Sequence, residues 1–192
     1  MNEMEVQDMT KVYPEFTLDK IGFCVPQGHI VGLIGRNGAG KSTTIKGILR
    51  LIAAEGAVSV FGKNMDEDEM AVKQMIGYVG GGFRYYPMNT LVSIRKAYAP
   101  FYPAWDQGKY ERLLAQFGLS ERKKVKGLSE GMKVKFALAL ALAHGARLLI
   151  MDEPTSGLDP LSREEFCDIV LQLVREEGVS VLFSTHITSD LM

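Results

Sequence analysis

Gly35-Arg36-Asn37-Gly38-Ala39-Gly40-Lys41-Ser42-Thr43 is the stretch that decides the fold of this 192-residue chain. It matches the phosphate-binding pattern G-x-x-x-x-G-K-[ST] at every fixed position. The apolar run before it, Ile30–Ile34, is typical of a buried parallel strand. The residues after it, Thr43–Ile52, carry Ile and Leu at helical spacing. The motif therefore lies between a predicted strand and a predicted helix, which is the context a phosphate loop needs.

The chemistry of this loop follows from its position. A helix beginning near Lys41 presents unpaired N–H groups and the positive end of its dipole. We expect Gly35, Gly38 and Gly40 to take positive φ, which bends those N–H groups around a phosphate. Lys41 would reach the β- and γ-phosphates, and the Ser42 hydroxyl would ligate Mg²⁺. The alternative is a glycine-rich turn that binds nothing. By itself the motif predicts a nucleoside triphosphate with Mg²⁺ and does not separate kinases, GTPases and motors.

Composition is that of an ordinary globular domain, 46% hydrophobic and 23% charged. The formal net charge of -1 argues against a broad nucleic-acid footprint. Cys24 and Cys167 stand in apolar surroundings without a CxxC pattern, so we expect buried, reduced thiols of a cytosolic protein. The N-terminus has no signal-peptide pattern, and the longest apolar run, Phe136–Ala143, is too short to cross a bilayer. A membrane role would therefore require a partner.

Around the phosphate loop the pattern predicts an α/β fold with a mostly parallel sheet core, an N-terminal antiparallel β piece and a helical subdomain. The expected strands are residues 4–12, 16–25, 55–62 and 76–79, and the expected helices lie at 65–75 and between 90 and 118. Tyr13 is expected in the loop between the first two strands. From position alone, its ring could stack on a nucleobase or cap the edge of the core.

A second helix start is predicted at Leu128-Ser129-Glu130-Gly131-Met132, before an apolar helix over residues 133–144. Ser129 is a good N-cap residue, and a capped helix N-terminus can also bind an anion. Taken alone, this stretch is compatible with either an ordinary capped helix or an anion site. The basic run that precedes it, residues 122–126, is expected to be a solvated surface.

Two acids follow a third apolar run, in Leu148-Leu149-Ile150-Met151-Asp152-Glu153. A buried strand ending there places both at its carboxyl end, where ligands bind in open α/β sheets. Asp152 is suited to hold Mg²⁺, and Glu153 to accept a proton from an attacking water. The alternative is a pair of solvated loop acids. His186 follows the strand predicted at residues 179–184 and is either a γ-phosphate sensor or an ordinary surface residue.

Together these stretches resemble the ATP-binding subunit of ATP-binding-cassette (ABC) transporters over nearly the whole chain. Five motifs stand in the family's order, and the second of them, a Leu-Ser-x-Gly signature, is absent from most P-loop enzymes. They are Gly35–Thr43, Leu128–Gly131, Leu148–Glu153, Ser156–Asp159 and Ser184–His186.

The resemblance implies ATP and Mg²⁺ as cofactors and two subunits paired head to tail, each ATP lying between one phosphate loop and the other subunit's signature. It implies Glu153 as the catalytic base, assisted by His186 and Lys41, with Ser42 and Asp152 at the metal and Asp159 in dimer crosstalk. It also implies a transmembrane permease subunit as partner and a place at the inner, cytoplasmic face of the cell membrane. The implied nucleotide-binding residues are Tyr13, Gly35, Asn37, Gly38, Ala39, Gly40, Lys41, Ser42, Thr43, Ser129 and Gly131.

Three features depart from the family pattern. Gly81 stands where the family commonly has a Gln that helps to place Mg²⁺ and water. Glu130 replaces the first Gly of the signature, and an acid beside a phosphate should weaken ATP capture unless it points away or pairs with a base. The chain also stops shortly after His186, where the family normally continues, so we expect it to lack the usual C-terminal end.

The expected division is a core of residues 1–80 and 147–192 and a helical subdomain of about 83–144. The wording of Leu128–Lys133 and Phe101–Asp106 is similar to bacterial exporter ATPases of the multidrug, bacitracin or acetoin kind. The alternatives are a soluble ABC-type ATPase of DNA repair or ribosomes, a small-molecule kinase, and a cassette that binds ATP but hydrolyses it poorly. A kinase would need an acceptor site and an Arg-rich lid, and the sequence indicates neither.

Overall fold

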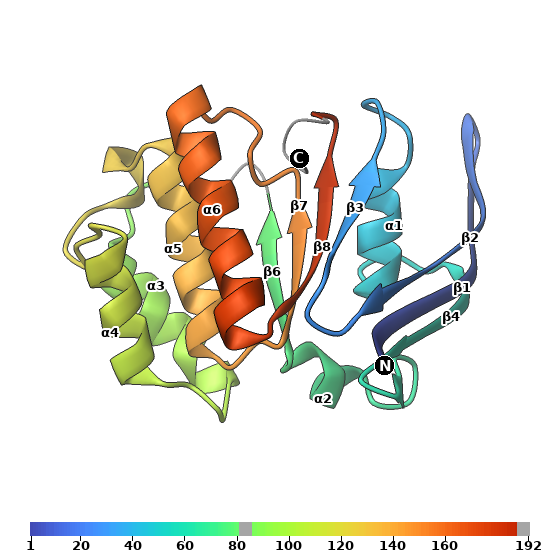
Figure 1. Cartoon of the computed structure of the whole chain (residues 1–192), viewed down its shortest axis with the longest axis horizontal. Helices are drawn as coiled ribbons and strands as arrows, with labels where there is room; N and C mark the ends of the chain where they lie inside the picture. Colours follow the sequence, from blue (N-terminus) through green and yellow to red (C-terminus); the bar gives the residue numbers. More distant parts are fainter. Residues whose placement is uncertain (81–85, 188–192) are drawn as a thin grey trace.

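The computed structural model describes residues 1–80 and 86–187, which form two four-stranded sheets with helices around them (Figure 1). One sheet is parallel throughout, in the order β3-β8-β7-β6. Its strands are β3 (Ile30–Ile34), β6 (Ile76–Gly80), β7 (Leu148–Asp152) and β8 (Ser180–Thr185). Since all four run the same way, their carboxyl ends meet at one edge, at the top of Figure 1.

The other sheet is antiparallel, in the order β2-β1-β4-β5. Its strands are β1 (Asn2–Tyr13), β2 (Phe16–Pro26), β4 (Glu55–Val60) and β5 (Lys63–Asn64). β1 and β2 form a long hairpin, and the antiparallel β piece expected from the sequence is thus confirmed. The Tyr13 prediction differs in detail: this residue is the last of β1 and pairs with Phe16 across the hairpin.

Helix α1 (Lys41–Ile48) lies between the two sheets (Figure 1). Its Ile45 and Ile48 are fully buried in one core cluster. Alternation along the parallel strands divides the core between the two faces of that sheet. Leu148 and Ile150 belong to the α1 cluster, whereas their neighbours Leu149 and Met151 belong to the cluster of the opposite face. The parallel sheet is therefore covered on both sides, as its apolar strands require.

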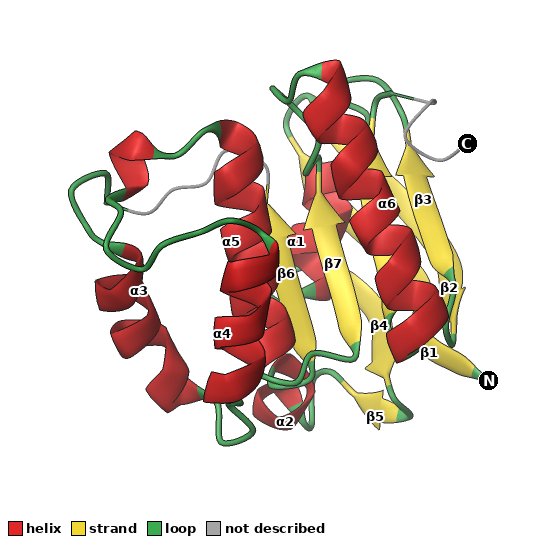
Figure 2. Ribbon diagram, turned by 60° about the vertical axis from the view of Figure 1, so that its left-hand side comes forward, coloured by secondary structure: helices red, strands yellow, loops and turns green. Residues whose placement is uncertain are grey.

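The opposite face carries the other long helices. α3 (Leu91–Tyr98), α4 (Gln107–Gln116) and α5 (Glu130–Ala143) lie together on the side of β6, and α6 (Pro160–Glu177) lies over the sheet, roughly along its strands (Figure 2). The remaining short elements are α2 (Glu69–Lys73) and two 3-10 turns, η1 (Ala99–Phe101) and η2 (Val125–Gly127). Pro100 falls within η1, and Pro103 lies between η1 and α4, so the prolines interrupt the helical region where the sequence predicts.

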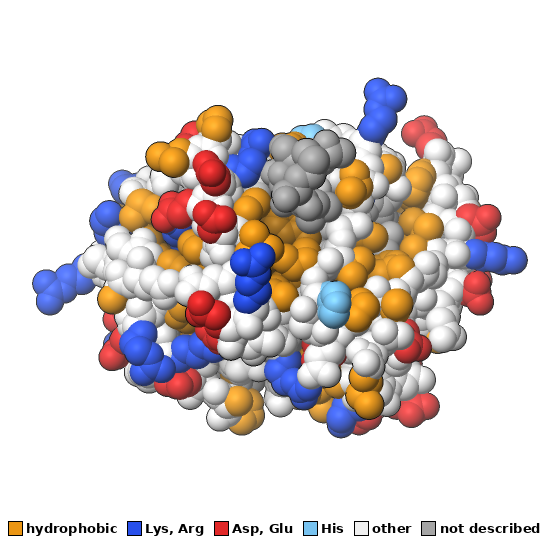
Figure 3. All heavy atoms as spheres, in the orientation of Figure 1, with side chains coloured by type: hydrophobic (Ala, Val, Ile, Leu, Met, Phe, Trp, Pro, Cys, Tyr) orange, Lys and Arg blue, Asp and Glu red, His pale blue; other side chains and the backbone are white. Residues whose placement is uncertain are grey.

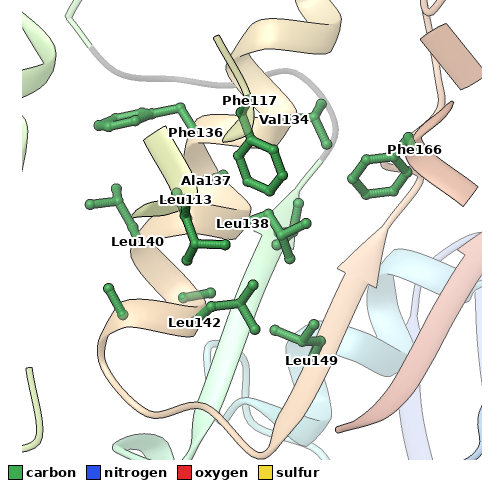
Figure 4. Close-up of a cluster of buried hydrophobic side chains, with 14 of the residues drawn as sticks. Leu113, Phe117, Val134, Phe136, Ala137, Leu138, Leu140, Leu142, Leu149 and Phe166 are labelled. Atoms are coloured by element: carbon green, nitrogen blue, oxygen red, sulfur yellow. The ribbon is translucent and has the colours of Figure 1, made fainter. Parts of the chain in front are cut away.

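α5 is the centre of this second core, and its side chains are drawn with their neighbours in Figure 4. From Phe136 onward the helix is buried on every side, which explains its lack of a polar face. β6 approaches it closely at Gly77, where a Cβ would lie 2.7 Å from Ala141 Cβ and 2.6 Å from Leu149 Cδ2. Glycine is needed there because the strand and the helix leave no room for a methyl group.

Several helix predictions were too long. The helix expected over residues 43–52 ends at Ile48, because Leu49 caps it and Arg50 takes a left-handed φ of 53° while pairing with Asp66. The helix expected at 65–75 covers only Glu69–Lys73, since Met65 is instead buried in the core beneath it. The basic run at 122–126 is largely exposed, as expected.

The burial predicted for the two cysteines was wrong: Cys24 is exposed and Cys167 is partly exposed. Cys24 belongs to β2, where alternation turns it away from the core that its neighbour Val25 enters. The two cysteines are not joined in a disulfide. The position of Gly81 lies outside the described residues.

Charged side chains of both signs are interspersed on the face drawn in Figure 3. That face therefore shows no continuous basic surface of the kind that binds nucleic acid. Within residues 1–80 and 86–187, no helix combines the length and the apolar character needed to cross a bilayer.

Candidate functional site

The loop between β3 and α1 is shaped by two left-handed glycines. Gly38 has a φ of 83° and Gly40 a φ of 94°, as predicted, and Gly40 immediately precedes the first helical residue, Lys41. Gly35 differs from the prediction, since it is not among the residues with positive φ. Glycine suits this position because the loop packs closely there: a Cβ would lie 3.1 Å from Ala39 Cβ.

Lys41 is almost enclosed by this loop, at 8% exposure. Its Nζ donates hydrogen bonds to the carbonyl oxygens of Gly35 at 2.7 Å and Arg36 at 3.2 Å. The same Nζ lies 3.1 Å from Glu153 Oε1. These contacts use the three protons of the ammonium group and hold its charge at the mouth of the loop.

A pocket of about 350 Å³ opens over the start of α1. This size suits a small ligand. The N–H groups of the helix start and the Lys41 charge make it a site for an anion. The residues lining the pocket come from β2, the loop, α1 and the end of β7: Phe16, Asn37, Gly38, Gly40, Lys41, Ser42, Thr43 and Glu153.

Asp152 lies at the carboxyl end of β7 and is brought to α1 by the sheet. Its Oδ1 accepts hydrogen bonds from Ser42 Oγ at 3.1 Å and from Ser184 Oγ at 2.8 Å. Ser42 and Asp152 stand far apart in the sequence, so the predicted meeting of the loop with the acidic strand end does occur in the fold.

These two residues fit Mg²⁺. A hydroxyl and a carboxylate are hard oxygen ligands, and the Ser42 and Asp152 oxygens converge to 3.1 Å. Mg²⁺ usually takes one or two protein ligands of this kind and completes its shell with phosphate and water. The neighbouring phosphate pocket could supply the remaining ligands.

Glu153 stands between a lysine and a histidine. Its Oε1 contacts Lys41, and its Oε2 lies 3.1 Å from His186 Nδ1. Its backbone takes a φ of 48°, which is uncommon for a residue with a side chain and is often found at functional sites. The geometry therefore joins Lys41, Glu153 and His186 in one chain of contacts at the pocket.

The signature residues lie at a separate helix start. Ser129 caps α5, its Oγ accepting a hydrogen bond from the Met132 N–H at 3.2 Å. Gly131 faces the start of α6, where a Cβ would lie 3.4 Å from Ser162 Cβ. Within the described part of the chain, the lining of the phosphate pocket includes neither Ser129 nor Gly131. The starts of α5 and α6 nevertheless lie at the same end of the parallel sheet as the phosphate loop (Figure 1).

Glu130 does not stand as an unpaired acid at this helix start. Its Oε1 accepts a hydrogen bond from Lys133 Nζ at 2.6 Å, one helical turn away. Of the two conditions under which the sequence argument tolerated an acid here, pairing with a base is the one that the structure meets.

Asp159 caps α6, with Oδ1 accepting from the Ser162 N–H at 3.0 Å and Oδ2 from the Ser162 hydroxyl at 2.6 Å. These hydrogen bonds from Ser162 lower the pKa of the Asp159 carboxyl, which stays ionised at the positive helix end. Gly131 and Asp159 thus meet at the same residue, Ser162.

Two residues of the site were missed by the sequence analysis. Phe16 lines the pocket, and its ring lies so near Gly40 that a Cβ there would come within 2.7 Å of Phe16 Cζ. The sequence shows an aromatic residue at the start of a predicted strand, but no local pattern predicts that this ring contacts the phosphate loop. Ser184 contacts Asp152 and belongs to a quoted motif, yet no role was given to it.

Comparison with known proteins identifies a family and relatives that this chain resembles. The ABC transporter family model matches residues 18–156. The bacitracin transport ATP-binding protein BcrA of Enterococcus faecalis is 34% identical over 192 residues, covering 98% of this chain and 62% of BcrA. The chain thus spans about three fifths of the length of this curated relative.

Two solved structures share the fold. An ATP-binding subunit of an ABC transporter superposes with a TM-score of 0.83 at 32% identity, covering 97% of this chain and 80% of that one. A dimeric ATP-binding cassette in a post-hydrolysis state, bound to ADP and Pi, superposes with a TM-score of 0.82 at 25% identity, covering 97% and 89%.

Proposed function

Because the chain belongs to the ABC transporter family, we propose that it binds and hydrolyses ATP as the nucleotide-binding subunit of a membrane exporter. The observation that carries the proposal is the pocket at the carboxyl edge of the parallel sheet. There Lys41 contacts Glu153, and Ser42 contacts Asp152. The similarity to a bacitracin transport protein supports the exporter class.

ATP binding would use the loop and the hairpin beside it. The N–H groups of residues 35–43 and the Lys41 ammonium take the phosphates, since both present positive charge to the pocket. Tyr13 is the proposed adenine contact. Its pairing with Phe16, which lines the pocket, supports this, because it places the Tyr13 end of the hairpin beside the phosphate loop.

Ser42 and Asp152 would hold Mg²⁺, which when bound offsets the negative charge of the phosphates. Glu153 accepts a proton from water as the water oxygen bonds to the γ-phosphorus. The bond from that phosphorus to the bridging oxygen breaks, and its electron pair leaves on ADP. His186 contacts the γ-phosphate, and Lys41 stabilises the charge of the transferring group.

A second subunit would complete each site. Ser129 and Gly131 begin a helix whose capped N-terminus is an anion site, but they belong to a different surface from the pocket of their own chain. Head-to-tail pairing would bring them to the partner's γ-phosphate, with Asp159 beside them in the dimer contact. The dimeric, ADP-bound cassette of the same fold supports pairing of two subunits.

The remaining partner is a transmembrane permease, which would hold the subunit at the inner, cytoplasmic face of the membrane. In this chain, residues 1–80 and 147–192 would form the ATP-binding core, and residues of about 83–144 would form the helical subdomain. The relation to a transport protein favours this over a soluble ABC-type ATPase. Closing of the dimer on ATP and its reopening after hydrolysis would move the permease through different contacts in the two states.

The test is phosphate release by the purified protein with Mg-ATP, together with its mass by light scattering. The wild type should release phosphate in a Mg²⁺-dependent way. Nucleotide binding without hydrolysis, including in the presence of a membrane partner, would favour a cassette that binds ATP only. The absence of nucleotide binding would refute the proposal.

A further inference from the structure

Ser184 joins the two acids of the site through one buried hydroxyl. The residue is fully buried, lies near the end of β8, and is the register partner of Asp152 across the parallel sheet. Its Oγ donates a hydrogen bond to Asp152 Oδ1 at 2.8 Å. The same Oγ accepts a hydrogen bond from the Glu153 N–H at 3.0 Å.

The hydrogen count makes this arrangement specific. A hydroxyl has one proton, and Ser184 directs it to the Asp152 carboxylate. The oxygen lone pairs are then left to accept the Glu153 N–H, which also lies 3.1 Å from the Ser184 carbonyl oxygen. One side-chain atom therefore holds the carboxylate of Asp152 and the backbone of Glu153 in a fixed relation.

Glu153 needs such support. Its left-handed φ of 48° is unfavourable for a side-chain-bearing residue and persists only where the surroundings enforce it. This backbone places the carboxylate between Lys41 and His186. The bond from the Glu153 N–H to Ser184 ties that unusual turn to the rigid end of β8.

Ser42 also donates to Asp152, but the proposed function gives its hydroxyl to Mg²⁺. The proposed function assigns no ligand to the Ser184 hydroxyl. We propose that Ser184 is a positioning residue that sets the Asp152 carboxylate for Mg²⁺ and the Glu153 carboxylate for water. The inference rests on the proposed function of this site.

The test compares Ser184→Ala with Ser180→Ala. Ser180 lies on the same strand, is also fully buried, and its Oγ accepts a hydrogen bond from the Gly28 N–H at 2.7 Å. Both variants lose one buried hydroxyl, but only Ser184 touches the acids. Thermal unfolding of both proteins measures the structural cost that they share.

The readouts are kcat and KM for Mg-ATP, the Mg²⁺ concentration for half-maximal activity, and the affinity for a fluorescent ADP analogue with Mg²⁺ or with EDTA. Ser184→Ala should lower kcat and raise the Mg²⁺ requirement, each by about 10- to 100-fold, as losses of groups that orient metal ligands do. Mg²⁺ should strengthen its ADP binding less than in the wild type, while binding in EDTA stays within about twofold, because Lys41 and the loop are intact. Ser180→Ala should match the wild type in all of these.

The inference is overturned if Ser184→Ala and Ser180→Ala have the same kcat and the same Mg²⁺ dependence of ADP binding. If the wild type binds ADP but releases no phosphate, the hydrolysis proposal fails, while the Mg²⁺ dependence of ADP binding still decides the role of Ser184. If the wild type binds no nucleotide, the proposed function fails and the inference falls with it.

Discussion

Lys41 Nζ and Glu153 Oε1 lie 3.1 Å apart, so the phosphate-loop lysine and the proposed general base form an ion pair across the pocket. The pair is shielded from solvent on the lysine side, where the side chain is 7% exposed, more than on the glutamate side at 24%. A phosphate that enters the pocket competes with Glu153 for the Lys41 charge. The proposed base, Glu153, therefore lies next to the site of the phosphate group on which its reaction leaves negative charge.

Replacing Glu153 by Gln should separate binding from hydrolysis. The amide cannot accept the proton, so phosphate release should fall by about 10²- to 10⁴-fold. The ATP-bound state should accumulate, and light scattering after gel filtration should show a dimer with Mg-ATP and a monomer without it.

A Glu153→Gln protein that binds ATP but remains a monomer would count against the two-subunit site. Repeating the measurement with the proposed permease partner added, and with Glu130→Gly, would then identify what prevents dimerisation. A dimer restored by either change would keep the head-to-tail arrangement, whereas a monomer in all three conditions would remove it.

Lys133 should matter through Glu130. In Lys133→Met the Glu130 carboxylate loses the ammonium 2.6 Å away, and in the proposed dimer it would face the partner's phosphates uncompensated. Repulsion of about 1 kcal/mol should raise the ATP concentration needed for dimerisation by about fivefold. Adding Glu130→Gly should restore dimerisation. Lys109→Met is the matched control, because it breaks an ion pair of the same length with Glu177, away from the phosphate pocket and the signature.

An unchanged ATP dependence in Lys133→Met would mean that Glu130 points away from the partner's nucleotide. A loss that Glu130→Gly does not rescue would assign Lys133 a role of its own.

Two kinds of contact at the candidate site could be anticipated from the sequence: those set by the shared edge of parallel strands and those within one helical turn. Ser42 and Asp152 were expected together since carboxyl ends of parallel strands share one edge, and their hydroxyl and carboxylate oxygens do meet. The family expected from five motifs is confirmed by the match over residues 18–156. Ser129 as N-cap is confirmed because capping is decided by residues within one turn.

What sequence reasoning missed depends on contacts between distant segments. Phe16 reaches Gly40 across the sheets, and Ser184 reaches Asp152 through strand register, which no local pattern specifies. The left-handed backbone of Glu153 cannot be deduced from its residue type, since glutamate normally avoids it. The pairing of Glu130 with Lys133 is different: their spacing of one helical turn could have indicated it.

His144 should make stability depend on pH. The side chain is 1% exposed, contacts the Tyr98 hydroxyl through Nδ1 at 2.8 Å and stacks on Tyr102 at 4.0 Å. Burial lowers the pKa of His144 to about 4 from 6.5. The unfolded chain therefore binds an extra proton between those values. This contribution to the free energy of unfolding is complete above pH 6.5 and is lost as pH falls toward 4, by up to about 3 kcal/mol.

Urea unfolding at pH 7.5, 5.5 and 4.5 checks this. His144→Phe should be less stable at pH 7.5, because the hydrogen bond between His144 and the Tyr98 hydroxyl is lost, but should lose less stability than the wild type on acidification. The exposed His29 provides the control, since His29→Gln should keep the wild-type slope. Equal slopes for wild type and His144→Phe would contradict the role of His144.

Gly131 offers the sharpest separation of fold from function. It is the second residue of α5, its φ is not positive, and a Cβ there would make ordinary contacts at 3.4 Å or more. Gly131→Ala should therefore raise the free energy of unfolding by about 0.5–1 kcal/mol, as alanine does in helices. It should nevertheless weaken ATP-driven dimerisation of the Glu153→Gln protein, because the added methyl group takes up space at the helix start that is proposed to receive the partner's γ-phosphate. Gly108 is the second residue of α4 and has the same 3.4 Å clearance, so Gly108→Ala should be stabilising and keep dimerisation. If the two variants dimerise equally well, Gly131 does not approach the partner's nucleotide.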